Sequence, residues 1–130
     1  VSAVSLSADQ YSSALTAKFT NFKATVSNVS ASVVTAINAD AKVSGYTVAD
    51  TAANLATNLA ALVTAGAGTK LTSISETGTP TAIDLSAAQF SATLVAKFAN
   101  FTANVTGVTA ANVATVSGNA KVSGIHQLQR

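Results

Sequence analysis

The chain contains an internal duplication, which constrains its fold more than any other feature of the sequence. Residues 4–45 align with residues 83–124 at a constant offset of 79 positions, without a gap, and 21 of the 42 aligned positions are identical. Biased composition does not explain why Gln10 and Phe19 match Gln89 and Phe98 in a single register. We therefore expect a single repeat domain, residues 1–130, with these parts: repeat copy one at 4–45, an intervening unit at 46–82, repeat copy two at 83–124 and a tail at 125–130.

Substitutions between the two copies indicate which positions face a core. Apolar bulk is kept at four aligned pairs: Val4/Ile83, Tyr11/Phe90, Ile37/Val116 and Tyr46/Ile125. Polar positions vary more freely, for example Asp9 against Ala88. The conserved bulk predicts buried positions, whereas the variable polar positions are expected to face water.

Each copy begins with a pattern that is typical of a helix start. Ser7 precedes Gln10 by three residues, which is the spacing of a capping box, and apolar residues then recur at the helical period. The apolar positions of copy one are Tyr11, Leu15, Phe19 and Phe22. The equivalent residues repeat this pattern in copy two, so the sequence predicts an amphipathic helix of about four turns in each copy.

Short alternating segments follow these helices and predict strands. The expected strands are residues 25–29, 42–48, 70–75, 104–108 and a segment from 121 onward. A second, shorter helix is expected from Ser30 to about Asn38, and its counterpart from Thr109 to about Ser117. Segments with the hydrophobic period of a strand alternate along the chain with segments that have the period of a helix, which favours β-α steps of about 26 residues.

The intervening unit follows the same order of elements. We expect Asp50 to cap a helix that carries Leu55, Leu59, Leu62 and Val63. Gly66 and Gly68 are expected to end this helix in left-handed conformations. Gly78 and Pro80 predict a turn before copy two begins.

The alternation of strands and helices predicts an α/β fold with parallel strands and right-handed crossovers. Because the strands are short and alternate in polarity, we expect helices on one sheet face and a polar surface on the other. This favours a parallel β-α repeat solenoid of about five to six short strand-helix steps. A compact α/β or α+β sandwich is the alternative. Ala, Ser and Thr make up 61 of the 130 residues, and small side chains allow helices to pack closely in either arrangement.

Three segments resemble the tandem repeats of large bacterial secreted and surface-associated proteins, which are adhesin-like and exported by a type I route. The segments are VSGYTVADTAANLATNLAAL (43–62), GTKLTSISET (68–77) and IDLSAAQFSATLVAKFANFTANVTGV (83–108). The chain departs from the pattern at Glu76, which stands at the acidic position after KLTSIS, and in its tail at 125–130. The resemblance implies a bacterial structural repeat at the cell surface and no reaction.

Composition disfavours an enzyme. The chain has no Cys and one histidine, His126, with no acidic residue near it in the sequence. The five acidic residues form no calcium-loop pattern, so we expect no metal site and no cofactor. The seven basic residues are scattered, which argues against nucleic-acid binding. No apolar run approaches the length of a membrane helix.

These observations favour an extracellular or cell-surface structural protein, either a fibre or surface-layer subunit or an adhesin repeat module. Its partners are expected to be copies of itself, joined head to tail by strand and helix stacking. We expect the outermost strands, about residues 1–6 and 121–128, to provide the contacts. The candidate edge residues are Val4, Leu6, Val122, Ile125 and Leu128. The alternative is a module whose polar strand face binds host or cell-surface glycans.

Overall fold

A computed structural model describes residues 3–127, in which seven parallel strands alternate with short helices. Four strands form the first sheet in chain order: β1 (Val4–Ser7), β2 (Ala24–Val29), β3 (Val43–Asp50) and β4 (Leu71–Glu76). Three strands form the second sheet, also in chain order: β5 (Ile83–Ser86), β6 (Ala103–Val108) and β7 (Val122–Gln127). The α/β class and the parallel pairing predicted from the sequence are therefore confirmed. The predicted continuous solenoid of five to six steps is not seen, because the described strands divide into two separate sheets between β4 and β5.

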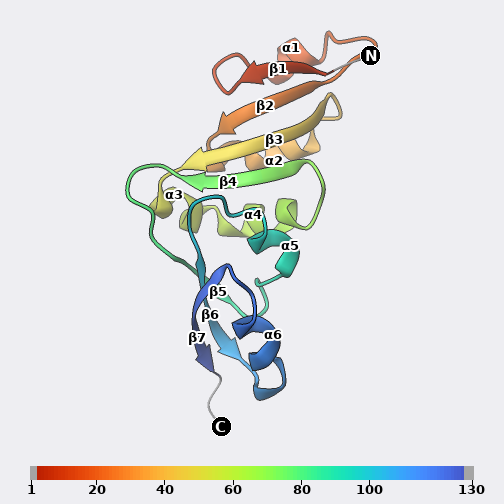
Figure 1. The fold of residues 1–130 in the computed structure, drawn as a ribbon. Helices are drawn as coiled ribbons and strands as arrows, with labels where there is room; N and C mark the ends of the chain where they lie inside the picture. The colour runs from red at the N-terminus through yellow and green to blue at the C-terminus, as the bar shows by residue number, and fades with distance from the viewer. Residues whose placement is uncertain (1–2, 128–130) are drawn as a thin grey trace.

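Every crossover within a sheet contains at least one short helix. The α-helices are α1 (Ser13–Thr16), α2 (Val34–Ala39), α3 (Ala52–Thr57), α4 (Leu59–Gly66), α5 (Ala92–Val95) and α6 (Val113–Ser117). Two 3₁₀ turns, η1 (Ala31–Val33) and η2 (Ala110–Asn112), precede α2 and α6. Figure 1 shows the first sheet at one end of the molecule and the second sheet at the other, with the N- and C-terminal marks at opposite ends.

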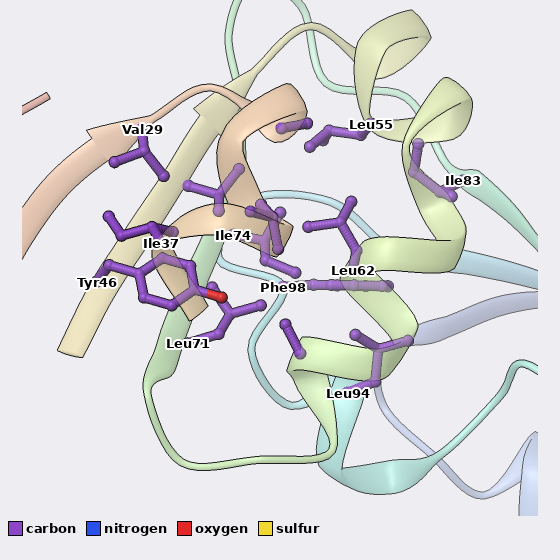
Figure 2. Close-up of a cluster of buried hydrophobic side chains, with 14 of the residues drawn as sticks. Val29, Ile37, Tyr46, Leu55, Leu62, Leu71, Ile74, Ile83, Leu94 and Phe98 are labelled. Carbon is purple, nitrogen blue, oxygen red and sulfur yellow. The ribbon is translucent and has the colours of Figure 1, made fainter. Parts of the chain in front are cut away.

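The core lies between the strands and their crossover helices, and it continues from the first sheet into the second. Figure 2 shows side chains from β2, β3, β4, α2, α3, α4 and α5 converging in it. Among the largest fully buried side chains are Ile37, Tyr46, Leu71, Ile74 and Leu94. The strands that supply this core alternate buried and more exposed residues, as expected for sheets with one covered face.

The contact between the two sheets is not a pairing of their successive strands. β4 and β5 are not hydrogen-bonded neighbours, and β4 instead forms an isolated parallel bridge from Ile74 to Phe98. The link between β4 and β5 is held by Glu76, whose Oε1 accepts a 2.7 Å hydrogen bond from Thr81 N. Gly78 adopts φ 78° in this link, where a turn was predicted.

The prediction of a four-turn helix in each copy is wrong. In copy one the helix is a single turn, α1, and it begins six residues after the predicted cap, Ser7. Its N-cap is Ser12, whose Oγ accepts from Leu15 N at 3.1 Å. The rings of Phe19 and Phe22 lie beyond the helix and stack with their centroids 4.3 Å apart. The helical spacing of these phenylalanines therefore reflects ring stacking in a non-helical segment.

The predicted capping-box hydrogen bonds form, but they close a turn and do not start a helix. Ser7 N donates to Gln10 Oε1 at 2.9 Å, and Gln10 N donates to Ser7 Oγ at 3.3 Å. Both bonds lie directly after β1. The same pair of bonds joins Ser86 and Gln89 after β5, so the motif marks the end of the first strand in each copy.

Two details of the intervening unit also differ from the prediction. The N-cap of α3 is Thr51, which accepts from Asn54 N at 3.1 Å, whereas Asp50 accepts from Ala31 N at 2.9 Å and ties η1 to the end of β3. Gly66 and Gly68 do not have positive φ. Gly66 is required for another reason, because a Cβ at this position would overlap Leu94 Cδ1 in α5.

The other predicted strands and the second helices are found within one or two residues of their expected bounds. Left-handed backbone occurs at one aligned pair of positions, Asn28 with φ 60° and Gly107 with φ 72°. Both lie in the second strand of their copy, beside an irregularity in the pairing. None of the helices in residues 3–127 has the length and apolar character needed to span a membrane.

Candidate assembly surfaces

The outer edge of β1 is open in the described part of the chain, where β1 pairs only with β2. Two predicted edge residues lie on this strand. Val4 is 41% exposed and Leu6 is half-buried against the core. An unpaired strand edge with an exposed valine is a surface that another strand or segment can cover.

The outer edge of β7 is open in the same sense, because β7 pairs only with β6 within residues 3–127. Val122 and Ile125 are half-buried and pack against a small cluster that contains Val105 and Val116. Leu128, the fifth predicted edge residue, lies outside the described residues. The structure therefore places four of the predicted residues on the two outermost strands, at opposite ends of the molecule (Figure 1).

Equivalent positions in the two copies differ in burial according to what lies next to them. Ile83, the counterpart of Val4, is 4% exposed because β5 lies against α3. Tyr46, the counterpart of Ile125, is 2% exposed because β4 pairs with β3. A position that is open at the edge of one copy is thus buried in the other copy, where the intervening unit lies beside it.

The intervening unit and copy two form a junction that the sequence prediction did not include. Ile74 N donates to Lys97 O at 2.8 Å, and Ala99 N donates to Ile74 O at 2.8 Å. Asn100 then binds the backbone of Glu76 twice. Its Oδ1 accepts from Glu76 N at 2.8 Å, and its Nδ2 donates to Glu76 O at 2.9 Å. The segment after α5 is therefore held against β4 by four backbone and amide hydrogen bonds.

Side chains from both parts fill the space between them. Eight apolar residues surround one small internal void of about 10 Å³: Leu55, Leu59, Leu62 and Ile74 from the intervening unit, and Ile83, Leu94, Phe98 and Phe101 from copy two. Lys97 Nζ donates to Gly68 O at 2.6 Å, and burial lowers the pKa of Lys97. The sequence carries no signal that locates this contact, because the offset of 79 residues relates the two copies to each other and not to the intervening unit.

Lysine ammonium groups bind carbonyl oxygens at several steps of the fold. Lys42 Nζ donates to Phe19 O, and its counterpart Lys121 donates to Phe98 O at 2.6 Å. Lys70 Nζ donates to the carbonyl oxygens of Asn38 and Asp40 at 3.1 and 2.9 Å. These lysines lie between successive steps, so their role is to hold the backbone of one step against the next.

Copy one contains a polar cluster at Asp40. Its Oδ2 accepts from Tyr11 OH at 2.8 Å and from Thr16 Oγ1 at 2.7 Å, and its Oδ1 accepts from Lys42 N at 2.8 Å. Burial alone would raise the pKa of Asp40, but these hydrogen bonds and the positive charge of Lys70 hold it below its ordinary value. Burial and the bond to Asp40 raise the pKa of Tyr11 to about 12.

No group of three or more His, Asp or Glu side chains in residues 3–127 could hold a metal ion. His126 is exposed on β7. Glu76 is 4% exposed, and its Oε2 has no hydrogen-bond partner within the described part of the chain, while Oε1 holds the link to β5. This carboxylate therefore has a visible role in joining the sheets.

The hydroxyl-bearing sheet face contains a shallow hollow of about 360 Å³ lined partly by Ser5, Thr25, Thr47 and Thr72. Most of these hydroxyls bind the sheet itself. Thr72 Oγ1 donates to Tyr46 O at 3.2 Å, and Thr47 Oγ1 accepts from Asn28 N at 2.8 Å. The hydroxyls of Thr47 and Thr72 are therefore already engaged with the backbone of neighbouring strands. Comparison of the chain with protein-family models, curated proteins and solved structures gave no match.

Proposed function

We propose that this protein is a non-enzymatic structural module that assembles with other repeat units head to tail at a cell surface or in an extracellular fibre. It acts as a segment of a parallel β-α solenoid, in which each step is covered by the next. The module belongs either to a self-assembling subunit or to a tandem array of the adhesin-like kind that the sequence resembles. No cofactor takes part in this function.

The observation that carries the proposal is the difference in burial between the duplicated copies. Val4 is 41% exposed at an open edge, whereas Ile83 at the equivalent position is 4% exposed beside the intervening unit. In repeat proteins each unit packs against its neighbours, so an uncovered apolar edge marks the place where a neighbour belongs. A net charge of +2 adds little repulsion between identical modules.

Self-association of the chain tests the subunit form of the proposal. We expect sedimentation velocity to show concentration-dependent growth, and electron microscopy to show filaments. Val4→Lys and Ile125→Lys place a charge at the two open edges and should abolish that growth. Thr72→Lys is the matched control, because this exposed residue lies on β4, on the opposite side of the first sheet from β1 and in a different sheet from β7.

A chain that stays monomeric at every concentration, with all three variants behaving alike, would show that it is not a self-assembling subunit. Binding of the monomer to a glycan array, removed by Thr72→Lys and kept by the edge variants, would instead support a glycan-binding module.

A further inference from the structure

We infer that the exposed face of copy one formed by Leu15, Lys18, Phe19 and Asn21 is a docking surface for the helix–strand part of a preceding repeat unit. The expected partner has the chemistry of residues 52–76: two short helices, the second ending in glycine, followed by a strand whose backbone can pair on its open side. This inference rests on the proposed function, since it takes the protein to be a stacking module, and it specifies what stacks on this face.

The junction inside the molecule supplies the template. Leu94, Lys97, Phe98 and Asn100 bind the intervening unit through the contacts described above, and each lies 79 residues after a member of the copy-one face. The four residue types are identical in the two copies. Leu94 is 1% exposed, whereas Leu15 is 37% exposed. The copy-one face thus presents the same groups without the partner that they contact in copy two.

The copy-one face already has the conformation of the bound one. The N-cap residues Ser12 and Ser91 have φ/ψ of −151°/149° and −148°/147°. The C-cap residues Ala17 and Ala96 have −59°/−22° and −60°/−22°. The phenylalanine rings stack at a centroid distance of 4.3 Å in both copies, with interplanar angles of 27° and 25°. A surface that needs no rearrangement loses little conformational entropy when it binds.

The apolar half of the junction is also present in copy one. Copy two contributes Ile83, Leu94, Phe98 and Phe101 to the shared void. Their counterparts are Val4, Leu15, Phe19 and Phe22, a set in which only the first residue differs. All four are exposed or half-buried in copy one. The missing half is the one that Leu55, Leu59, Leu62 and Ile74 supply in the internal junction.

A second folded copy of this chain does not supply that half. The open side of its β4 is already occupied at Ile74 by its own backbone at Lys97 and Ala99. Gly66 of its α4 is already covered by Leu94. The occupant is therefore the intervening-type segment of another repeat, whose own strand edge is free.

A chain extended by one unit tests this inference. Residues 46–82 are placed directly before residue 4 of the described chain, because residue 82 precedes residue 83 and residue 83 is equivalent to residue 4. The decisive readout is amide hydrogen exchange at Thr20, whose counterpart Ala99 donates to Ile74 O. We expect the Thr20 amide to exchange at least about tenfold more slowly in the extended chain.

Substitutions in the copy-one face give a second readout. Leu15→Ala and Asn21→Ala should lower Tm by less than about 2 °C in the original chain, where both side chains are exposed. In the extended chain Leu15→Ala should lower Tm by about 6 °C or more, and Asn21→Ala by a smaller but measurable amount. Measurements are made at a concentration where both chains sediment as monomers, so that self-association does not contribute.

A matched pair of variants in the added unit controls for non-specific stabilisation. Gly66→Val in the added unit should remove the protection at Thr20, because the new side chain would overlap Leu15. Ala67→Val, one residue further on and exposed, should leave it. Equal Thr20 exchange in the two chains, including the case of an unfolded added unit, would overturn the inference. An equal change in Tm on Leu15→Ala in the original and the extended chain would also overturn it. So would slow exchange at Thr20 that persists after Gly66→Val. The self-association of the original chain is measured separately, so docking can fail while assembly succeeds, or the reverse.

Discussion

Copy one and copy two are identical at half of their aligned residues, yet different strands are covered in each. In copy one the last strand, β3, is covered by β4, and the first strand, β1, is open. In copy two the first strand, β5, lies against α3, and the last strand, β7, is open. The position of the intervening unit between them accounts for both differences. Burial in this fold is therefore set by the neighbouring step and not by the local sequence alone.

The copies also differ in one group of linked substitutions. Tyr11, Thr16 and Asp40 form the polar cluster of copy one, and the equivalent residues in copy two are Phe90, Val95 and Asn119. Asn119 keeps the bond that Asp40 makes to the backbone, since its Oδ1 accepts from Lys121 N at 2.9 Å. In copy one, Lys70 of the next step supplies a positive charge beside the acid and its two hydroxyl donors.

The largest difference between the copies is expected at their first strands. Ile83→Ala should lower the free energy of unfolding by about 2–5 kcal/mol, because it leaves a cavity at the junction. Val4→Ala at the equivalent exposed position should cost within about 0.5 kcal/mol. Urea unfolding monitored by circular dichroism gives both values. Similar losses at the two positions would show that the open edge is buried in solution.

A smaller effect is expected at the polar cluster. Asp40→Ala removes the acceptor of Tyr11 OH, Thr16 Oγ1 and Lys42 N, and should cost about 1–3 kcal/mol. The triple variant Tyr11→Phe, Thr16→Val, Asp40→Asn installs the copy-two residues and should lie within about 1 kcal/mol of the original chain. The free energies of unfolding of the two variants decide this. A triple variant as unstable as Asp40→Ala would mean that the substitutions are not linked.

The tyrosine hydroxyl of the cluster makes copy one sensitive to alkali, whereas Phe90 in copy two has no such group. Burial and its hydrogen bond raise the pKa of Tyr11 to about 12, and burial raises that of Tyr46 to about 12, from the ordinary tyrosine value of 10.0. The folded state therefore holds these protons more tightly than the unfolded chain. The stability they contribute is complete below pH 10 and is lost as the pH rises towards 12.

Tm should fall as the pH is raised from 10 to 12, and this decrease in Tm should be smaller in the Tyr11→Phe variant. Absorbance of tyrosinate in the folded protein should rise only as the pH approaches 12. A tyrosine that ionises near pH 10 without loss of structure would contradict the buried placement.

The smallest effect is expected at the left-handed pair. Asn28→Gly copies the residue of copy two and should change stability by less than about 0.5 kcal/mol, because the backbone bond from Asn28 N to Thr47 is kept. Gly107→Ala places a Cβ at φ 72° and should cost about 1–2 kcal/mol. Thermal unfolding of the two variants compares them directly. An equal cost would show that φ is not the constraint at this position.

The strands and their parallel order were predictable because the alternation of apolar and polar residues is visible within each short segment, and the duplication shows the same pattern twice. The strands at Ala24–Val29 and Leu71–Glu76 agree closely with the predicted 25–29 and 70–75. The short length of the first helix in each copy was not predictable from spacing alone. Phenylalanines at helical spacing can stack in a turn, and only the bond from Leu15 N to Ser12 Oγ shows where the helix begins.

The structure places Val4, Leu6, Val122 and Ile125 on the outermost strands β1 and β7, as the alternating pattern predicts. Their role as assembly contacts stays a prediction. The internal junction was missed, because no periodicity marks a backbone contact such as that between Ile74 and Phe98. The offset of 79 residues transfers that contact to copy one only after its geometry is known.

The in-order pairing of the strands has a mechanical consequence. In Figure 1 the strands of the first sheet lie across the line between the two ends of the molecule, whereas those of the second sheet run closer to that line. A load between the ends would open the first sheet one hydrogen bond at a time, starting from an edge strand. It would load the bonds of the second sheet together. Tension on an array of such modules would therefore extend the first sheets stepwise while the second sheets held, and this would make each module an elastic element in series with a stiffer one.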